Sequence, residues 1–172
     1  ACVALQVLVC VGLLGLMFSA GQPVLPTSSA DVPVGTNPFA DLHGWDAAGQ
    51  RARELAAQHT LGSVAVQNWT LASRLGWYAR PLPVFVLEEG DSQFQLWSGP
   101  LPAGEGALLV DWSHMAYDPP VGAHGFATCQ LLDSLPVQHI GMPLARFRFY
   151  DCRGWAGATP QPRLTLAPIS RN

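Results

Sequence analysis

Amide and large aromatic side chains gather in one short segment, Ser92-Gln93-Phe94-Gln95-Leu96-Trp97. Amides donate and accept hydrogen bonds, and aromatic rings offer flat apolar faces, so together they suit the hydroxyl groups and ring faces of a sugar. The segment is predicted to be a loop. Gln93, Phe94 and Trp97 are therefore candidate substrate-binding residues, the alternative being that the loop only packs against another part of the protein.

Two further pairs of polar and aromatic residues lie where ligand contacts form. Asp111 and His114 come at the end of an apolar strand, and α/β proteins bind ligands at the carboxyl ends of their strands. A solvated loop pair is the simpler interpretation. His43 and Trp45 lie in the segment Asp-Leu-His-Gly-Trp-Asp, where they either anchor the loop or make a functional contact. All four are substrate-binding candidates.

Several chemistries lack their sequence signatures. The five histidines show no H-x-H or H-x-x-x-H spacing, so no metal site is predicted. No P-loop, G-x-G-x-x-G or G-x-S-x-G motif occurs, and no residue is assigned a catalytic role. The nine basic residues are all arginine and are scattered, and the net charge is -3. Nucleic acid is therefore not an expected partner.

The four cysteines fall into two pairs. Cys2 and Cys10 lie in the apolar first segment and are expected to be packing residues. Cys129 and Cys152 lie far along the chain, and an extracytoplasmic location would permit a disulfide between them. The sequence does not give their distance, so both the paired and the unpaired state stay open.

The elements that must position these residues centre on a strand–helix–strand unit. Val64 to Val66 alternates with period two, and Asn68 can cap a helix in which Leu71, Leu75 and Tyr78 form an apolar face. Trp69 and Trp77 of this helix are expected to be core residues. Arg80-Pro81 ends the helix, and the apolar runs 83–87 and 107–112 predict two further strands.

Three more segments complete the predicted domain. A helix is expected over 47–59, capped by Asp46, and a short helix over 126–135, ended by Pro136. Residues 146–152 alternate charged and aromatic side chains, which is typical of an edge strand. The predicted fold class is α/β: a small three-layer domain with a mostly parallel sheet of about four strands, preceded by one transmembrane helix.

The first segment, 1–21, contains no charged residue and is apolar apart from Gln6 and Ser19. About 20 such residues can span a hydrocarbon core, so a transmembrane helix is expected, with a signal peptide or a buried core helix as alternatives. The absence of an initiator methionine suggests that the chain begins inside a longer protein. Residues 22–38 are then a linker, 39–155 the domain and 156–172 a tail. The first arginine is Arg51, which favours an extracytoplasmic domain.

The motifs D-L-H-G-W-D, A-S-x-x-x-W-Y, S-Q-F-x-L-W and G-A-L-L-V resemble the C-terminal part of a family of bacterial integral-membrane glycosyltransferases. The family uses polyprenyl-phosphate-linked sugars and includes dolichyl-phosphate-mannose-protein mannosyltransferases and the aminoarabinose transferase that modifies lipid A. The resemblance runs from Asp41 to about Trp155. It implies the last helix of a truncated membrane region and the extracytoplasmic α/β domain that follows it.

The resemblance implies a transferase that moves a sugar from a polyprenyl-phosphate donor to a lipid or protein acceptor. The catalytic acidic residue of the family lies in an early loop outside this chain, so the fragment is expected to be a non-catalytic accessory domain. No cofactor is implied within it, although a divalent metal could serve the complete enzyme. The implied location is the inner membrane, with multiple spans, the lipid bilayer as a partner and the domain in the periplasm. The alternative is a membrane-anchored extracytoplasmic binding module without a catalytic role.

Overall fold

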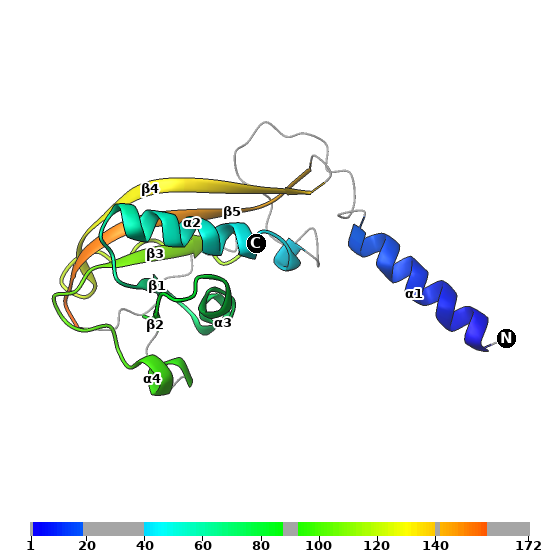
Figure 1. The fold of residues 1–172 in the computed structure, drawn as a ribbon, viewed down its shortest axis with the longest axis horizontal. Coiled ribbons are helices and arrows are strands. Elements are labelled where there is room, and N and C mark those ends of the chain that lie inside the picture. Colours follow the sequence, from blue (N-terminus) through cyan, green and yellow to red (C-terminus); the bar gives the residue numbers. More distant parts are fainter. Residues whose placement is uncertain (1, 19–39, 88–92, 140–141, 158–172) are drawn as a thin grey trace, which may run out of the picture.

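A computed structural model describes residues 2–18, 40–87, 93–139 and 142–157 (Figure 1). The predicted linker 22–38 and nearly all of the predicted tail lie outside these residues. In chain order the helices and strands are α1 (Cys2–Phe18), the 3-10 helix η1 (Ala40–Leu42), α2 (Trp45–Gln58), β1 (Val64–Val66), α3 (Trp69–Tyr78), β2 (Val84–Val86), α4 (Gln93–Ser98), β3 (Ala107–Trp112), β4 (Phe126–His139) and β5 (Met142–Trp155).

One five-stranded sheet runs through the domain in the order β2-β1-β3-β5-β4. Strand β1 pairs in parallel with β2 on one side and with β3 on the other. Strand β5 is antiparallel to both β3 and β4. The parallel half follows the predicted strand–helix–strand unit, but the sheet as a whole is mixed. The prediction of a mostly parallel sheet of about four strands is therefore wrong.

The segment from Phe126 to Leu135, which was predicted to be a helix, belongs to the long strand β4. Its residues pair with β5 from Phe126 opposite Trp155 to His139 opposite Met142. Pro136 cannot donate a ladder hydrogen bond, but β4 is the last strand of the sheet, where proline is tolerated. The proline that suggested the end of a helix thus lies in an edge strand.

The predicted edge strand is instead an inner strand. Strand β5 lies between β3 and β4, and its alternating side chains point to the two faces of the sheet. Phe147 and Phe149 are fully buried on the face that α2 and α3 cover. Arg148 belongs to the opposite face, where a buried carboxylate partners it. Charged and aromatic residues therefore alternate in β5 because the two faces of the sheet have different surroundings, and not because β5 is an exposed edge strand.

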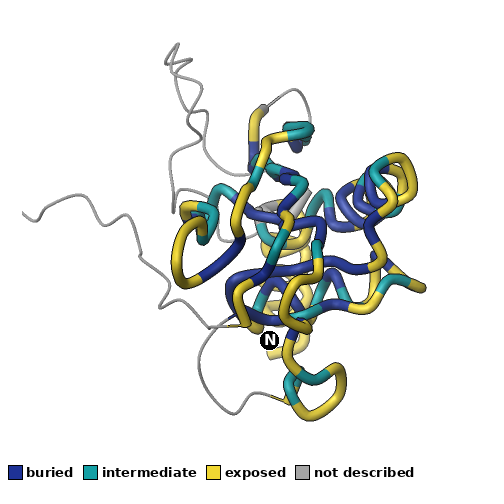
Figure 2. Tube along the Cα trace, turned by 90° about the vertical axis from the view of Figure 1, so that its left-hand side faces the viewer, coloured by how far each residue is buried: buried dark blue, intermediate teal, exposed yellow. Residues whose placement is uncertain are grey.

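Two layers, rather than the predicted three, make up the described domain. All buried hydrophobic residues of α2 and α3 belong to one hydrophobic cluster with Val64, Leu108 and Phe149 of the sheet. The cluster on the other face contains no helical residue and includes Leu101, from the loop before β3, and Phe126, the first residue of β4. We call the face under α2 and α3 the helix-covered face and the other the loop-covered face. Strands β1 and β3 are buried throughout, whereas most residues of the edge strand β4 are exposed or half-buried; Figure 2 colours the chain by burial.

Helix α3 begins as predicted: the Asn68 side chain accepts a hydrogen bond from the Leu71 N–H at 3.0 Å. Helix α2 differs, because its N-cap is Gly44 and not Asp46, which lies in the first turn. Gly44 has a φ of 83°, and a Cβ atom there would lie 2.5 Å from a Val137 methyl carbon. Only glycine meets both demands without strain.

Helix α1 is apolar apart from Gln6, and its residues 2–15 are exposed. Among the described residues, no helix combines the length and apolarity needed to cross a bilayer. The 17 residues of α1 extend about 26 Å at 1.5 Å per residue, against a hydrocarbon core of about 30 Å. The prediction of a transmembrane helix before the domain is therefore wrong for the segment as described.

Candidate functional site

The segment that was predicted to be a polar and aromatic loop forms the short helix α4. Phe94 turns inward and packs against the core cluster. Its ring meets Trp97 edge to face, with the centroids 5.3 Å apart. Leu96 and Trp97 are 82% and 69% exposed, and Gln93 is exposed too. Phe94 thus fixes the helix, whereas Gln93 and Trp97 remain open to a ligand.

Helix α3 carries a second exposed aromatic residue. Trp77 is 63% exposed, and the Arg80 guanidinium lies 4.5 Å from the centre of its ring. The neighbouring Gly76 faces Phe94, since a Cβ atom at Gly76 would lie 3.8 Å from the Phe94 ring. We call the exposed residues Trp77, Arg80, Gln93, Leu96 and Trp97 the α3–α4 aromatic surface.

The sequence prediction placed Trp69 and Trp77 in the core, yet both are exposed. Leu71 and Leu75 form the buried face of α3, and Trp69, Ser73 and Trp77 follow one another at four-residue intervals on another face. That spacing is visible in the sequence and could have identified the exposed tryptophans.

Asp111 is the most deeply buried acidic group described, at 2% exposure, and it lies on the loop-covered face of β3. Its Oδ1 accepts the Tyr117 N–H at 2.9 Å, and its Oδ2 accepts both Nε and Nη2 of Arg148, at 2.9 and 2.5 Å. Burial raises the pKa of the Asp111 carboxyl group, although the Tyr117 N–H and the Arg148 charge oppose the shift. Nearby, Gln67 donates to the Asp118 carbonyl group at 3.0 Å.

His114 does not join Asp111. Its Nε2 lies 2.7 Å from the Leu144 carbonyl oxygen, and its ring lies 4.8 Å from that of Trp112, on the helix-covered face. The two residues that were predicted as one candidate pair therefore face different partners. Asp111 and Arg148 form a structural ion pair, whereas His114 ties the end of β3 to β5.

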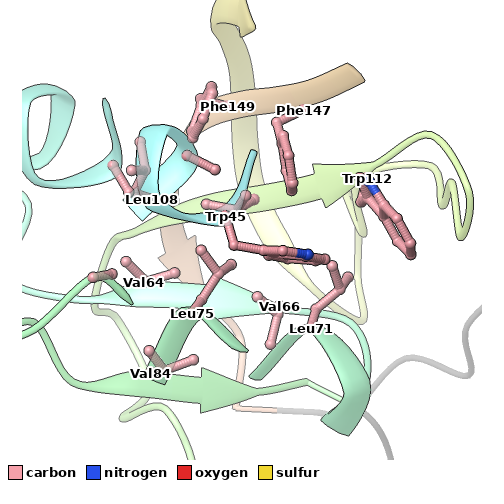
Figure 3. Packing of buried hydrophobic residues seen from close by; sticks show 14 of the residues in the cluster. Trp45, Val64, Val66, Leu71, Leu75, Val84, Leu108, Trp112, Phe147 and Phe149 are labelled. Carbon is pink, nitrogen blue, oxygen red and sulfur yellow. The ribbon is translucent and has the colours of Figure 1, made fainter. Parts of the chain in front are cut away.

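His43 and Trp45 are also separated. The His43 ring stacks on His139 with the centroids 4.6 Å apart. Trp45 is 3% exposed, donates its indole N–H to the Asp41 carbonyl group and lies under the Arg74 guanidinium. Figure 3 shows its ring among Leu71, Trp112 and Phe147. Trp45 is thus a core residue that anchors the loop and is not placed to contact a ligand.

Cys129 and Cys152 lie directly opposite each other on β4 and β5 and form a disulfide. Within the described residues, no three histidine, cysteine, aspartate or glutamate side chains lie close enough together to hold a metal ion. No family model, curated protein or solved structure matches the chain.

Proposed function

We propose that this chain is the C-terminal part of a glycosyltransferase that uses polyprenyl-phosphate-linked sugars, and that its α/β domain is a non-catalytic accessory domain. One observation carries the proposal: the α3–α4 aromatic surface leaves two tryptophan rings and an amide open on adjoining helices. Such a surface suits a sugar or the apolar part of an acceptor. The proposal concerns the domain and gives α1 no membrane-spanning role.

The location that we propose for the domain is extracytoplasmic, at the membrane that carries the transferase. The Cys129–Cys152 disulfide supports it, because disulfides persist in oxidising compartments and are rare in the cytosol. The lipid bilayer, the lipid-linked sugar and a lipid or protein acceptor are the proposed partners of the complete polypeptide.

Transferase activity of the complete polypeptide tests the role of this surface. Trp97→Ala removes its most exposed ring without touching the core, and we expect activity to fall by up to about tenfold, as for the loss of one aromatic contact of about 0.5–1.5 kcal/mol. Leu131→Ala is the matched control, because Leu131 is a 51% exposed apolar residue on the distant strand β4. Equal activity of both variants and the wild type would rule the proposed role out.

Sugar binding by the present chain distinguishes the transferase from the binding module. Titration with sugars, followed by tryptophan fluorescence of the wild type and of Trp97→Ala, reports contact at α4. Binding that is lost in Trp97→Ala, in a polypeptide without any transferase activity, would replace the transferase proposal with that of a binding module.

A further inference from the structure

The parallel half of the sheet contains a topological switch point. From β1 the chain passes through α3 to β2 on one side, whereas β3 lies on the other side of β1 (Figure 1). The carboxyl ends of β1 and β3 therefore lie side by side, with connections leaving in different directions. Open α/β sheets bind ligands in the crevice outside such a pair of strand ends. The residues at this place are Asn68, after β1, and Trp112, at the end of β3.

Both residues carry an enclosed hydrogen-bond donor that has no partner. Asn68 is 4% exposed and Trp112 is 5% exposed, and neither the Asn68 Nδ2 nor the Trp112 Nε1 meets an acceptor. A flipped Asn68 amide does not explain its unpaired Nδ2, because the Oδ1 already accepts the Leu71 N–H. An unpaired buried donor costs about 1–3 kcal/mol, so two at one place indicate an acceptor that belongs there.

The two donors belong to residues at neighbouring strand ends. Val64 pairs with Leu108 and Ala65 with Leu109, so β1 and β3 lie side by side and run in the same direction; Asn68 is the second residue after β1, and Trp112 is the last residue of β3. Val64 and Val66 of β1 and Leu108, Val110 and Trp112 of β3 all belong to the helix-covered face. Asn68 at the N-terminus of α3 therefore adjoins the end of β3 on that face.

The N-terminus of α3 is a third feature that favours a negatively charged ligand at this place. The helix has ten residues, and no acidic side chain lies in its first turn. Its free N–H groups and the positive end of its dipole favour an anion. The nearest buried carboxylate, that of Asp111, lies on the opposite face of the sheet, where Arg148 neutralises it.

We propose that the β1–β3 switch point binds a small oxyanion, a phosphate or carboxylate group, through the Asn68 Nδ2, the Trp112 Nε1 and the N-terminal amides of α3. This site is separate from the α3–α4 aromatic surface and does not depend on the proposed function. Residues 113–118 follow the end of β3, and Gln67 donates to the Asp118 carbonyl group.

Nuclear magnetic resonance of the indole N–H groups tests the site directly, with inorganic phosphate as the probe and chloride at equal ionic strength as the control. The chain has six tryptophans, and the signal that Trp112→Phe lacks identifies Trp112. We expect this signal to shift with a saturable dependence on phosphate, and the melting temperature to rise in parallel. No saturable shift of the Trp112 signal in the wild type would overturn the proposal and leave the donors to an enclosed water molecule.

Two substitutions remove the donors and keep the packing. Asn68→Asp keeps an oxygen for the Leu71 N–H, replaces the free donor with an acceptor and should abolish phosphate binding. Trp112→Phe keeps an aromatic ring and should weaken binding about tenfold, as for one hydrogen bond. Trp155→Phe, which removes a buried indole from the other face, should bind like the wild type. Wild-type phosphate affinity in Asn68→Asp would overturn the proposal even if Trp112→Phe failed to fold.

Discussion

Burial and hydrogen-bond partners have opposite effects on the pKa of the Asp111 carboxyl group, at the end of β3. The Arg148 guanidinium and the Tyr117 N–H both stabilise the carboxylate, and burial still raises its pKa. The folded chain therefore holds this proton more tightly than the unfolded chain does. Its titration contributes stability that is fully present below the ordinary pKa and is lost as the pH rises through the higher pKa of the folded state.

Asp111→Asn removes this titration and leaves Arg148 without its charge partner. At neutral pH we expect the free energy of unfolding to fall by about 1–3 kcal/mol, because the asparagine oxygen can still accept the Tyr117 N–H. The difference between the wild type and the variant should be larger near pH 4 than near pH 8. Urea denaturation across that range measures it; a difference that grows with pH would show that Arg148 outweighs burial.

The sequence indicated Asp111 but could not indicate its partner. An acidic residue at the end of an apolar run marks a strand end on local evidence alone. Arg148 lies 37 residues further on, and only the antiparallel pairing of β3 with β5 sets it opposite Asp111. The same argument applies to Trp112. Its indole N–H is buried without an acceptor, and only the folded structure shows that none lies beside it.

Helices α2 and α3 cross closely at a glycine. A Cβ atom at Gly49 would lie 2.4 Å from the Tyr78 carbonyl oxygen, which is backbone and cannot rotate away. Gly49→Ala should therefore lower the free energy of unfolding by about 1–3 kcal/mol by forcing the helices apart. Gly62→Ala is the matched control, since no heavy atom lies within 4 Å of its Cβ position. Equal denaturation midpoints for the two variants would contradict the close crossing.

Helix α2 is also joined to the edge strand β4 by an ion pair. The Arg51 Nε donates to the Asp133 carboxylate at 2.6 Å, and this hydrogen bond lowers the pKa of Asp133. The lowered pKa contributes stability above the ordinary value that is lost as the pH falls through the folded value, the opposite sign to Asp111.

Asp133→Asn should cost less than about 1 kcal/mol at neutral pH, because both side chains are about one-third exposed. The cost should disappear in acid. Urea denaturation at several pH values checks this, and Asp111→Asn serves as the comparison with the opposite slope. A cost that persists at the acid end would show that the pair acts through packing and not through charge.

Local patterns predicted the parallel half of the sheet and failed for the antiparallel half. Strands β1 to β3 and helix α3 lie where periodicity and the Asn68 cap placed them, because each is specified by adjacent residues. Strand β4 resembled a helix ended by Pro136, since nothing local shows its pairing with β5. Helix α4 resembled a loop because its few residues hold together through Phe94 and the distant core.

Strand β5 unites the two halves of the domain, and the disulfide fastens it to β4 on the side away from β3. Cys152 is fully buried in the cluster of the loop-covered face, together with Leu109, Phe126 and Trp155. The hairpin therefore contributes four of the nine buried residues of this cluster, to which no helix contributes. The stability of the described domain should then depend on the redox state of one bond.

Replacing both Cys129 and Cys152 with serine should lower the free energy of unfolding by about 3 kcal/mol, as expected for a cross-link between residues 23 apart in sequence. That is a large share of the 5–15 kcal/mol of a typical domain. Denaturation of the wild type with and without a reductant checks the loss independently of the substitution. The control is the double serine variant of Cys2 and Cys10, two exposed thiols on α1, which should unfold like the wild type. If the reduced wild type and the Cys129/Cys152 variant both matched the oxidised protein in stability, the cross-link would not support the fold. The argument from the disulfide to an oxidising compartment would fail with it.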